Sequence, residues 1–526
     1  MAREFEGKKL LILGGNPETT PLVETANNMG VITIVTSGRA SDPAKKAAHK
    51  AYDVDGLDVE GLVKLARDEK VDGVLVGVAD ILVPAYCKVC EILNLPCYAT
   101  QQIVDVFSFK DKFKETCEKY GVHGIPEFNP EDLENIKFPV MIKPVDNGGG
   151  VGMTVAHNLD EYKRGVEIAL ANSHKKKFLV EKYMLCDDMG MYYTFKDGYC
   201  SASCIYDRYT TDEQPGLSRV CLGGTYPSKH IDKYFANMHN NILKLFKEIG
   251  IKNGVLMLSG FYENGEFYVY DTGFRLQGEA PHLLMKAIHG FDQREMLIRF
   301  ALTGSEGDID LEREDDARLR GKWAATLWFL LKQGRIAKIS GLENIAQDKR
   351  IVANIQRLKQ GDEVKAEWIG NEKQVLTRLY LVCGSKLELA EALKYYMQTV
   401  KVLDDNGNDM LLKGFDVDKA LELNNAGSSL SGIPARELNL SNSLSTAATV
   451  GGVQPLYNYL SALCLSQQNH SKIFRFRRLA ALYNKCLRDS RKAASSFQAG
   501  AELGSLYLNC RLYIKSGYSL NASACA

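Results

Sequence analysis

The fold is decided by the stretch FPVMIKPVDNGGGVGM, residues 138–153. Its first half reads as a buried strand that carries one lysine, Lys143, in an otherwise apolar run. Burying an unpaired ammonium group costs free energy, so Lys143 needs an anionic partner or an exit to solvent. The second half is rich in glycines that let backbone N–H groups surround phosphate oxygens: Gly148, Gly149, Gly150 and Gly152.

Two segments beside this stretch carry further polar groups suited to a nucleotide. Lys112 stands at the start of a predicted helix that ends near Gly121. Residues 178–184 read as a strand that ends in charge, and its free backbone edge could present N–H and C=O groups to an adenine ring. Glu181 in that strand could accept a hydrogen bond from the adenine amino group.

A β-hairpin is predicted over residues 260–271, with an Asn264-Gly265 turn. Its second strand runs into Asp271 and then into three polar residues spaced two apart, Arg275, Gln277 and Glu279. In an extended chain this spacing puts the three on one side. Acids, a guanidinium group and an amide together are typical of a site for metal and phosphate, although a solvated edge strand would show the same pattern.

Residues 8–105 alternate between strand and helix patterns. This alternation predicts a parallel sheet with helices on both faces, with strands at 9–13, 31–35 and 74–78 and helices at 21–29, 44–51 and 59–70. Ligands of such sheets bind at the carboxyl ends of the strands, here at 14–16 and 77–80. The glycines of 14–16 lack the G-x-G-x-x-G spacing, so a tight turn and a substrate-facing loop both remain open.

Composition bounds the class of protein. With 526 residues the chain is too long for one hydrophobic core, and 65 Lys+Arg balance 65 Asp+Glu, so no overall basic field predicts a nucleic-acid partner. No apolar run reaches the roughly 18 residues of a membrane helix, and the charged N-terminus lacks the apolar region of a secretory signal. We therefore expect a cytoplasmic protein with no membrane partner, in which the 13 cysteines are free thiols.

The overall balance of charge conceals an asymmetry. Residues 425–526 contain 11 Lys/Arg against 3 Asp/Glu and are rich in serine, which separates them from the preceding chain. We treat them as a basic tail of unknown order. Cys87 and Cys90 resemble half of a zinc or redox motif, but they lie in an apolar helical pattern with no suitably spaced second pair, which favours cysteines on a helix face.

Taken together, Lys112, Lys143 with its Gly-rich loop, Glu181-Lys-Tyr-Met and the hairpin leading to Asp271-x-x-x-Arg-x-Gln-x-Glu279 resemble the ATP-grasp superfamily. Within it the chain looks most like biotin carboxylase and the ATP-binding halves of the carbamoyl phosphate synthase large chain. The resemblance implies a mixed α/β and α+β architecture in four parts: a Rossmann-like pre-ATP-grasp domain (1–108), an ATP-grasp domain (109–320) with a mobile lid at about 138–184, a carboxylase-like C-terminal cap subdomain (321–424), and the tail (425–526).

The resemblance also implies roles for single residues. Lys112 and Lys143 would contact the ATP phosphates, and the four glycines of 148–152 would close over the triphosphate. Glu181 would bind the adenine amino group, with backbone atoms of Lys182, Tyr183 and Met184 along the ring edge and Asp188 at the ribose. Asp271 would bind Mg²⁺, while Arg275, Gln277 and Glu279 would face the acceptor and the transferred phosphoryl group. The implied cofactors are ATP and Mg²⁺.

The chain departs from the family at two positions. Ser259 stands where a further acid is usual, and Gly273 stands where an asparagine is usual, so two of three expected magnesium ligands are missing. Either ATP, Asp271 and water hold the metal, or neighbouring acids substitute, or catalysis has been lost.

Two functions follow from the resemblance. The first is an ADP-forming ligase that activates a small carboxylate as an acyl phosphate for attack by an amine or other nucleophile. The second is an ATP-binding protein that no longer ligates, which Ser259 and Gly273 favour. The expected partners are small molecules, with a homodimer left open, and no motif identifies the carboxylate or the nucleophile.

Overall fold

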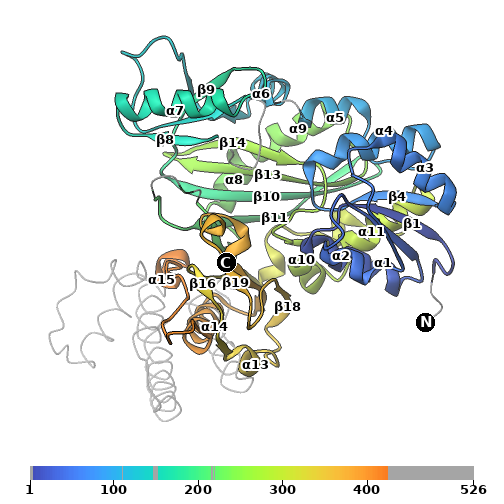
Figure 1. Cartoon of the computed structure of the whole chain (residues 1–526). Helices are drawn as coiled ribbons and strands as arrows, with labels where there is room; N and C mark the ends of the chain where they lie inside the picture. The colour runs from blue at the N-terminus through green and yellow to red at the C-terminus, as the bar shows by residue number, and fades with distance from the viewer. Residues whose placement is uncertain (1–3, 109, 146–151, 215–216, 218, 424–526) are drawn as a thin grey trace, which may run out of the picture. The chain divides into compact units, whose positions relative to one another are not determined.

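The computed structural model describes residues 4–108, 110–145, 152–214, 217 and 219–423 (Figure 1). One compact unit of the chain ends at Asn424, where the composition changes. The predicted tail, residues 425–526, and the glycines at 148–150 lie outside the described residues. The class is mixed α/β, as the sequence predicts.

A four-stranded sheet near the N-terminus has the order β3-β2-β1-β4, and all its pairings are parallel. Its strands are β1 (Lys9–Leu13), β2 (Ile32–Thr36), β3 (Lys50–Tyr52) and β4 (Gly73–Val76), and the helices that alternate with them are α1 (Thr20–Asn28), α2 (Pro43–Ala47), α3 (Val59–Glu69) and α4 (Val83–Leu93). The helix predicted at 44–51 is wrong at its end. It stops at Ala47 because Lys50 and Ala51 pair with Ile34 and Val35 of β2.

A nine-stranded sheet forms the centre of the described chain (Figure 1). Its order is β18 (Ile351–Gln356), β20 (Val375–Cys383), β15 (Trp323–Leu330), β12 (Cys221–Tyr226), β11 (Tyr199–Thr210), β10 (Asp187–Lys196), β13 (Gly254–Glu263), β14 (Glu266–Gly273) and β5 (His123–Gly124). The predicted hairpin is confirmed as β13 and β14, and Asn264 and Gly265 both take positive φ in its turn.

A second four-stranded sheet lies between the sheet strands β5 and β10 in the chain. It has the order β6 (Glu127–Phe128), β9 (Phe178–Lys182), β7 (Val140–Pro144) and β8 (Thr154–Ala156), and α7 (Leu159–Ala171) packs on it. These elements share their own small hydrophobic cluster, which includes Val140, Ile142 and Val180. The described residues between 127 and 182 therefore form a layer with a separate core (Figure 1).

The predicted domain boundary at 320/321 does not coincide with a break in the central sheet. β15, β18 and β20 follow this boundary, yet they extend the same sheet as β10 to β14. The hydrophobic packing does change there, because a separate buried cluster runs from Ala325 to Leu421 and takes in Val220 to Leu222. The cap region thus shares a sheet with the preceding residues but packs around its own core.

The remaining elements connect these layers. The helices are α5 (Gln101–Ser108), α6 (Lys110–Lys119), α8 (Ile231–Asn237), α9 (His239–Ile249), α10 (His282–His289), α11 (Gln293–Thr303), α12 (Leu311–Glu314), α13 (Leu342–Ile345), α14 (Lys386–Thr399) and α15 (Val417–Ala420). Two further sheets have two strands each: β16 (Gly334–Arg335) pairs with β19 (Glu363–Val364), and β17 (Lys338–Ser340) pairs with β21 (Lys401–Leu403). Among the described helices, none combines the length and the apolar character that crossing a bilayer requires.

One buried carboxyl group should make stability depend on pH. Glu306 follows α11 and is 1% exposed, and burial raises its pKa from 4.5 to about 7, with the Asp197 carboxylate acting in the same direction. The folded chain therefore binds this proton more tightly than the unfolded chain, so the contribution is fully present below about pH 4.5 and is lost as pH rises through 7. We expect a loss of about 3 kcal/mol in the free energy of unfolding across this range.

Glu306→Gln should remove this part of the pH dependence and stabilise the protein at pH 8. Urea unfolding of the variant and the unaltered chain at pH 5 and pH 8 measures the effect. Glu60→Gln is a matched control, because Glu60 is exposed on α3. Stability curves for Glu306→Gln that run parallel to those of the unaltered chain would contradict the assignment.

Candidate functional site

Lys143 has the anionic partner that its buried strand demands. Its Nζ lies 2.6 Å from Oε2 of Glu181, and the two side chains are only 12% and 11% exposed. The residues stand on the neighbouring antiparallel strands β7 and β9, where Lys143 pairs with Leu179 and Glu181 pairs with Met141. The sequence predicts both residues for a nucleotide site, and the structure places them in direct contact with each other.

The one described glycine of the Gly-rich loop has a packing reason to be glycine. Gly152 takes φ +74°, and a Cβ atom there would lie 2.6 Å from Cβ of Asn172 at the end of α7. A side chain would also meet Pro144 at 3.0 Å. Gly152 thus packs too closely against Asn172 and Pro144 to carry a side chain.

Two backbone N–H groups of the segment predicted to lie along the adenine ring already have partners in the structure. The Lys182 N–H donates to the Pro126 carbonyl at 2.9 Å, and the Tyr183 N–H donates to the Pro139 carbonyl at 3.1 Å. Both N–H groups are thus engaged inside the small sheet, and contact of other backbone atoms of residues 182–184 with a ring edge stays a prediction. The side chains of Tyr183 and Met184 are buried, and the Lys182 ammonium pairs with Glu263 at the end of β13.

Lys112 lies on α6, with its side chain 52% exposed, and its Nζ is 3.6 Å from Oδ2 of Asp105 on α5. This ion pair is long and partly solvated. Half of the Lys112 side-chain surface is exposed, so a ligand can reach it.

A largely buried polar cluster lies on the central sheet. Arg208 on β11 donates from Nε to Oε1 of Glu279 at 2.7 Å and lies 3.1 Å from Oδ2 of Asp188 on β10. Tyr206 donates its hydroxyl to Oε2 of Glu279 at 2.9 Å and accepts from Nε2 of Gln277 at 2.6 Å. The predicted residues Asp188, Gln277 and Glu279 are thus brought together, and Arg208 and Tyr206 join them.

The charges in this cluster stabilise one another. Burial raises the pKa of Asp188 above its ordinary value. Burial by itself would lower the pKa of Arg208, but the Glu279 and Asp188 carboxylates raise it well above its ordinary value. Arg208 therefore stays a cation. Asp188, predicted at a ribose, is engaged by this guanidinium group.

Arg275 pairs with a residue of the N-terminal sheet, whereas Gln277 and Glu279 bond to Tyr206 and Arg208. β14 ends at Gly273, and the Arg275 guanidinium Nη2 pairs with Oδ2 of Asp80, which follows β4 of the N-terminal sheet. Its Nη1 donates to the Leu276 carbonyl at 3.1 Å. The Arg275 side chain is 8% exposed, so it is held rigidly at the carboxyl end of the parallel sheet.

Asp271 is exposed on β14, and Ser259 of β13 is its direct partner in the antiparallel register. The described residues contain no group of three or more His, Cys, Asp or Glu side chains arranged to hold a metal ion. Mg²⁺ in nucleotide sites takes one or two carboxylates and completes its shell with phosphate oxygens and water. Asp271 can supply one such carboxylate.

β20 holds the main chain that carries Gln277 and Glu279. Arg378 is completely buried and donates from Nη1 to the Gly278 carbonyl at 2.7 Å. Tyr380, two residues along the strand, donates its hydroxyl to the Glu279 carbonyl at 3.1 Å. The cap region therefore positions the polar cluster through backbone carbonyls.

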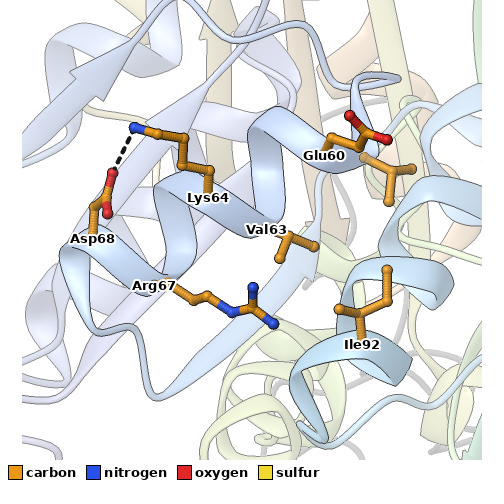
Figure 2. Close-up of a pocket in the computed structure, with 7 residues that line it drawn as sticks. Glu60, Val63, Lys64, Arg67, Asp68 and Ile92 are labelled. Carbon is orange, nitrogen blue, oxygen red and sulfur yellow. Dashed lines mark hydrogen bonds and ion pairs between the residues drawn. The ribbon is translucent and has the colours of Figure 1, made fainter.

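An open groove of about 380 Å³ lies elsewhere, between side chains of α3 and α4 (Figure 2). Its lining combines apolar residues (Val59, Val63 and Ile92) with charged ones (Glu60, Lys64, Arg67 and Asp68), and none of the predicted site residues lines it. Cys87 and Cys90 are buried on α4, and both are free thiols, as are the other described cysteines. This agrees with cysteines on a helix face.

The central part of the chain is similar to a known family. Residues 112–306 match the family model described as carbamoyl-phosphate synthase L chain, ATP binding domain, which is of the ATP-grasp type. The carbamoyl phosphate synthase large chain of Clostridium beijerinckii is 25% identical over 302 residues, which are 52% of this chain and 27% of that protein. The resemblance to the ATP-grasp superfamily is confirmed.

Two other proteins are similar. The formate-dependent phosphoribosylglycinamide formyltransferase of Sulfurisphaera tokodaii is 27% identical over 199 residues, which are 35% of this chain and 49% of that protein. The chain thus aligns with about half or less of these relatives' lengths. The biotin carboxylase domain of the Hydrogenobacter thermophilus 2-oxoglutarate carboxylase has the same fold, with a TM-score of 0.61, 15% identity, and coverage of 81% of this chain and 95% of that one.

Proposed function

Because residues 112–306 resemble the ATP-binding domain of a carbamoyl phosphate synthase, we propose that this chain is an ADP-forming ligase. A carboxylate oxygen of the acceptor attacks the γ-phosphorus of ATP, the bond to the β,γ-bridging oxygen breaks, and ADP leaves. The resulting acyl phosphate is attacked at its carbonyl carbon by an amine or another nucleophile, and phosphate departs. The observation that carries this proposal is the Lys143–Glu181 pair in the matched region.

This pair supports a nucleotide site because both groups are nearly buried and each neutralises the other. ATP supplies a partner for each of them: the triphosphate for the Lys143 ammonium, and the adenine amino group for the Glu181 carboxylate. Lys112 and the glycines of 148–152 would complete the phosphate contacts, with Met184 and main-chain carbonyls of the 182–184 segment beside the ring. Asp188 would reach the ribose once Arg208 releases it.

Arg275, together with Gln277 and Glu279, would face the acceptor and the transferred phosphoryl group. Asp271 would hold Mg²⁺, which when bound offsets the negative charge of the phosphate oxygens. Arg275 would add positive charge beside the acceptor carboxylate while its Nη2 stays paired with Asp80. Lys143 would stabilise charge that develops on the transferred group.

The part boundaries remain proposals: 1–108, 109–320 with a lid at about 138–184, 321–424, and 425–526. The separate core of residues 127–182 supports a lid that moves as one body. Closure of such a layer over the central sheet would exclude water from the acyl phosphate. We also propose a homodimer as the assembly.

A nucleotide-binding protein without ligase activity is the second candidate, and Ser259 and Gly273 favour it. A panel of amino acids and small carboxylates, each tested with and without an amine, separates the two. Carboxylate-dependent release of ADP identifies a ligase. Tight ATP binding with no release of ADP under any condition identifies a binding protein.

Lys143→Ala should weaken binding of a non-hydrolysable ATP analogue about 10- to 100-fold, since one charge-assisted contact to phosphate is lost. Calorimetric titration measures the affinity, and circular dichroism establishes that the variant is folded. Lys163→Ala, an exposed lysine on α7, is the matched control and should bind as the unaltered chain does. Unchanged affinity in folded Lys143→Ala would overturn the phosphate site.

A further inference from the structure

We propose that Asp80 supplies the metal-binding oxygen that Gly273 lacks. The inference rests on the proposed MgATP site and adds to it a ligand from the N-terminal sheet. Asp80 belongs to the 3-10 turn Asp80–Leu82 that follows β4, so it lies 195 residues from its partner Arg275 in the chain. It therefore carries no signal in the sequence motif around Asp271.

The space beside Gly273 is already filled by Asp80. A Cβ atom at position 273 would lie 2.5 Å from Oδ1 of Asp80 and 3.1 Å from Cζ of Arg275. The side-chain oxygen of an asparagine lies roughly 2.4 Å from its own Cβ, by bond lengths and trigonal angles. Oδ1 of Asp80 thus stands at the distance from Cβ where an asparagine at this position would hold its oxygen.

The backbone does not require glycine at this position. Gly273 is the last residue of β14, and its φ is not positive, unlike that of the turn residue Gly265. An L side chain could adopt this conformation without strain. The Asp80 carboxylate, rather than the main chain, therefore excludes a side chain at 273.

The Asp80 carboxylate is oriented for a second contact. Its Oδ2 is held by Arg275, whose side chain is 8% exposed and also fixed through the Leu276 carbonyl. Oδ1 is the oxygen near β14. Asp80 itself is 49% exposed, so a cation can reach its carboxylate.

Asp271 completes the arrangement. It stands two residues before Gly273 on β14, so by strand alternation both positions present their Cβ directions to the same face. Two carboxylates, one from β14 and one from the turn after β4, match the one or two that Mg²⁺ takes when phosphate oxygens and water fill its other positions. A neighbouring acid thus substitutes for the missing asparagine, and the metal site joins the N-terminal sheet to the central sheet.

The test exchanges the two oxygen donors. Full-length chains carrying Asp80→Ala, Gly273→Asn or both are titrated with Mn²⁺ in the presence of a non-hydrolysable ATP analogue, and bound Mn²⁺ is followed by electron paramagnetic resonance. Asp80→Ala should weaken Mn²⁺ binding at least about tenfold, since losing a group that only supports a metal ligand already costs that much. Gly273→Asn alone should also weaken it, because the new side chain collides with Asp80.

The double variant, Asp80→Ala with Gly273→Asn, tests whether an asparagine oxygen can replace the Asp80 oxygen. Removing the Asp80 carboxylate frees the space for the amide oxygen that Gly273→Asn introduces, so Mn²⁺ affinity should return to within about threefold of the unaltered chain. Asp55→Ala, an exposed carboxylate after β3, is the control and should leave Mn²⁺ affinity unchanged. Thermal unfolding of each variant establishes that it is folded.

Three results would overturn the proposal. If the double variant binds Mn²⁺ as weakly as Asp80→Ala does, an asparagine oxygen at position 273 does not replace the Asp80 oxygen. Unchanged Mn²⁺ binding with tighter binding of inorganic phosphate in Asp80→Ala would make Asp80 an occupant of the Arg275 anion site instead. Failure of the unaltered chain to bind the ATP analogue overturns the proposed function as well, whereas the first two results leave it intact.

Discussion

Arg378→Ala should lower the free energy of unfolding by about 3–5 kcal/mol, the cost of removing one partner from a buried ion pair. Arg378 is fully buried, and its guanidinium group lies 2.7 Å from Glu372 and 3.2 Å from Glu18. Its Cζ atom also lies 3.8 Å from the centre of the Trp328 ring, a cation–π contact. The alanine variant loses these three contacts and the hydrogen bond to the Gly278 carbonyl, and it leaves Glu18, which is nearly buried, with less compensation.

Urea unfolding at pH 7 measures this loss. Arg335→Ala is the control, because Arg335 forms an exposed ion pair with Asp405 at 3.0 Å and its removal should cost no more than about 1 kcal/mol. If the two substitutions lower the free energy of unfolding equally, the buried contacts of Arg378 contribute no more than an exposed ion pair.

Asp271→Asn should reduce ADP formation by at least about 10²- to 10³-fold, the usual cost of losing one group that stabilises transition-state charge. Asparagine keeps the size and one oxygen but removes the negative charge that offsets the metal. Binding of MgATP should fall only modestly, because Lys112, Lys143 and the Gly-rich loop still contact the phosphates. Turnover and nucleotide affinity are measured side by side on the same preparations.

Asp68→Asn on α3 serves as the control for Asp271→Asn, since Asp68 is an exposed residue paired with Lys64. A non-ligating ATP-binding protein would show no ADP formation to lose. Full turnover in Asp271→Asn would mean that the metal site, and the register of β14 on which it rests, is misplaced.

The local patterns predicted the fold well where one element decides its own structure. Alternation over residues 8–105 predicted the parallel strands, and Asn264-Gly265 predicted the β13–β14 turn. The charge of Lys143 predicted an anionic partner, and Glu181 fills that place. The helix at 44–51 was too long because strand pairing with β2, which the local pattern does not show, takes the residues after 49.

The sequence could not show the contacts that bring distant elements together. Asp80 meets Arg275 from the turn after β4, and Arg378 meets the Gly278 carbonyl from β20. Arg208 carried a usable signal, since a single arginine in the mostly apolar strand β11 needs buried acids, and it finds Asp188 and Glu279. Its partners could be named only once the strand order was known.

Transfer of an oxygen atom tests the central claim most directly. The carboxylate that gives the strongest ADP release is supplied with both carboxylate oxygens labelled with ¹⁸O, together with ATP, Mg²⁺ and an amine, and the released phosphate is examined by mass spectrometry. An acyl phosphate route predicts one ¹⁸O atom in each phosphate, because the nucleophile breaks the bond between the acyl carbon and the bridging oxygen. Phosphate that carries no label while ADP accumulates, or a panel in which no carboxylate raises ADP release, would contradict the account.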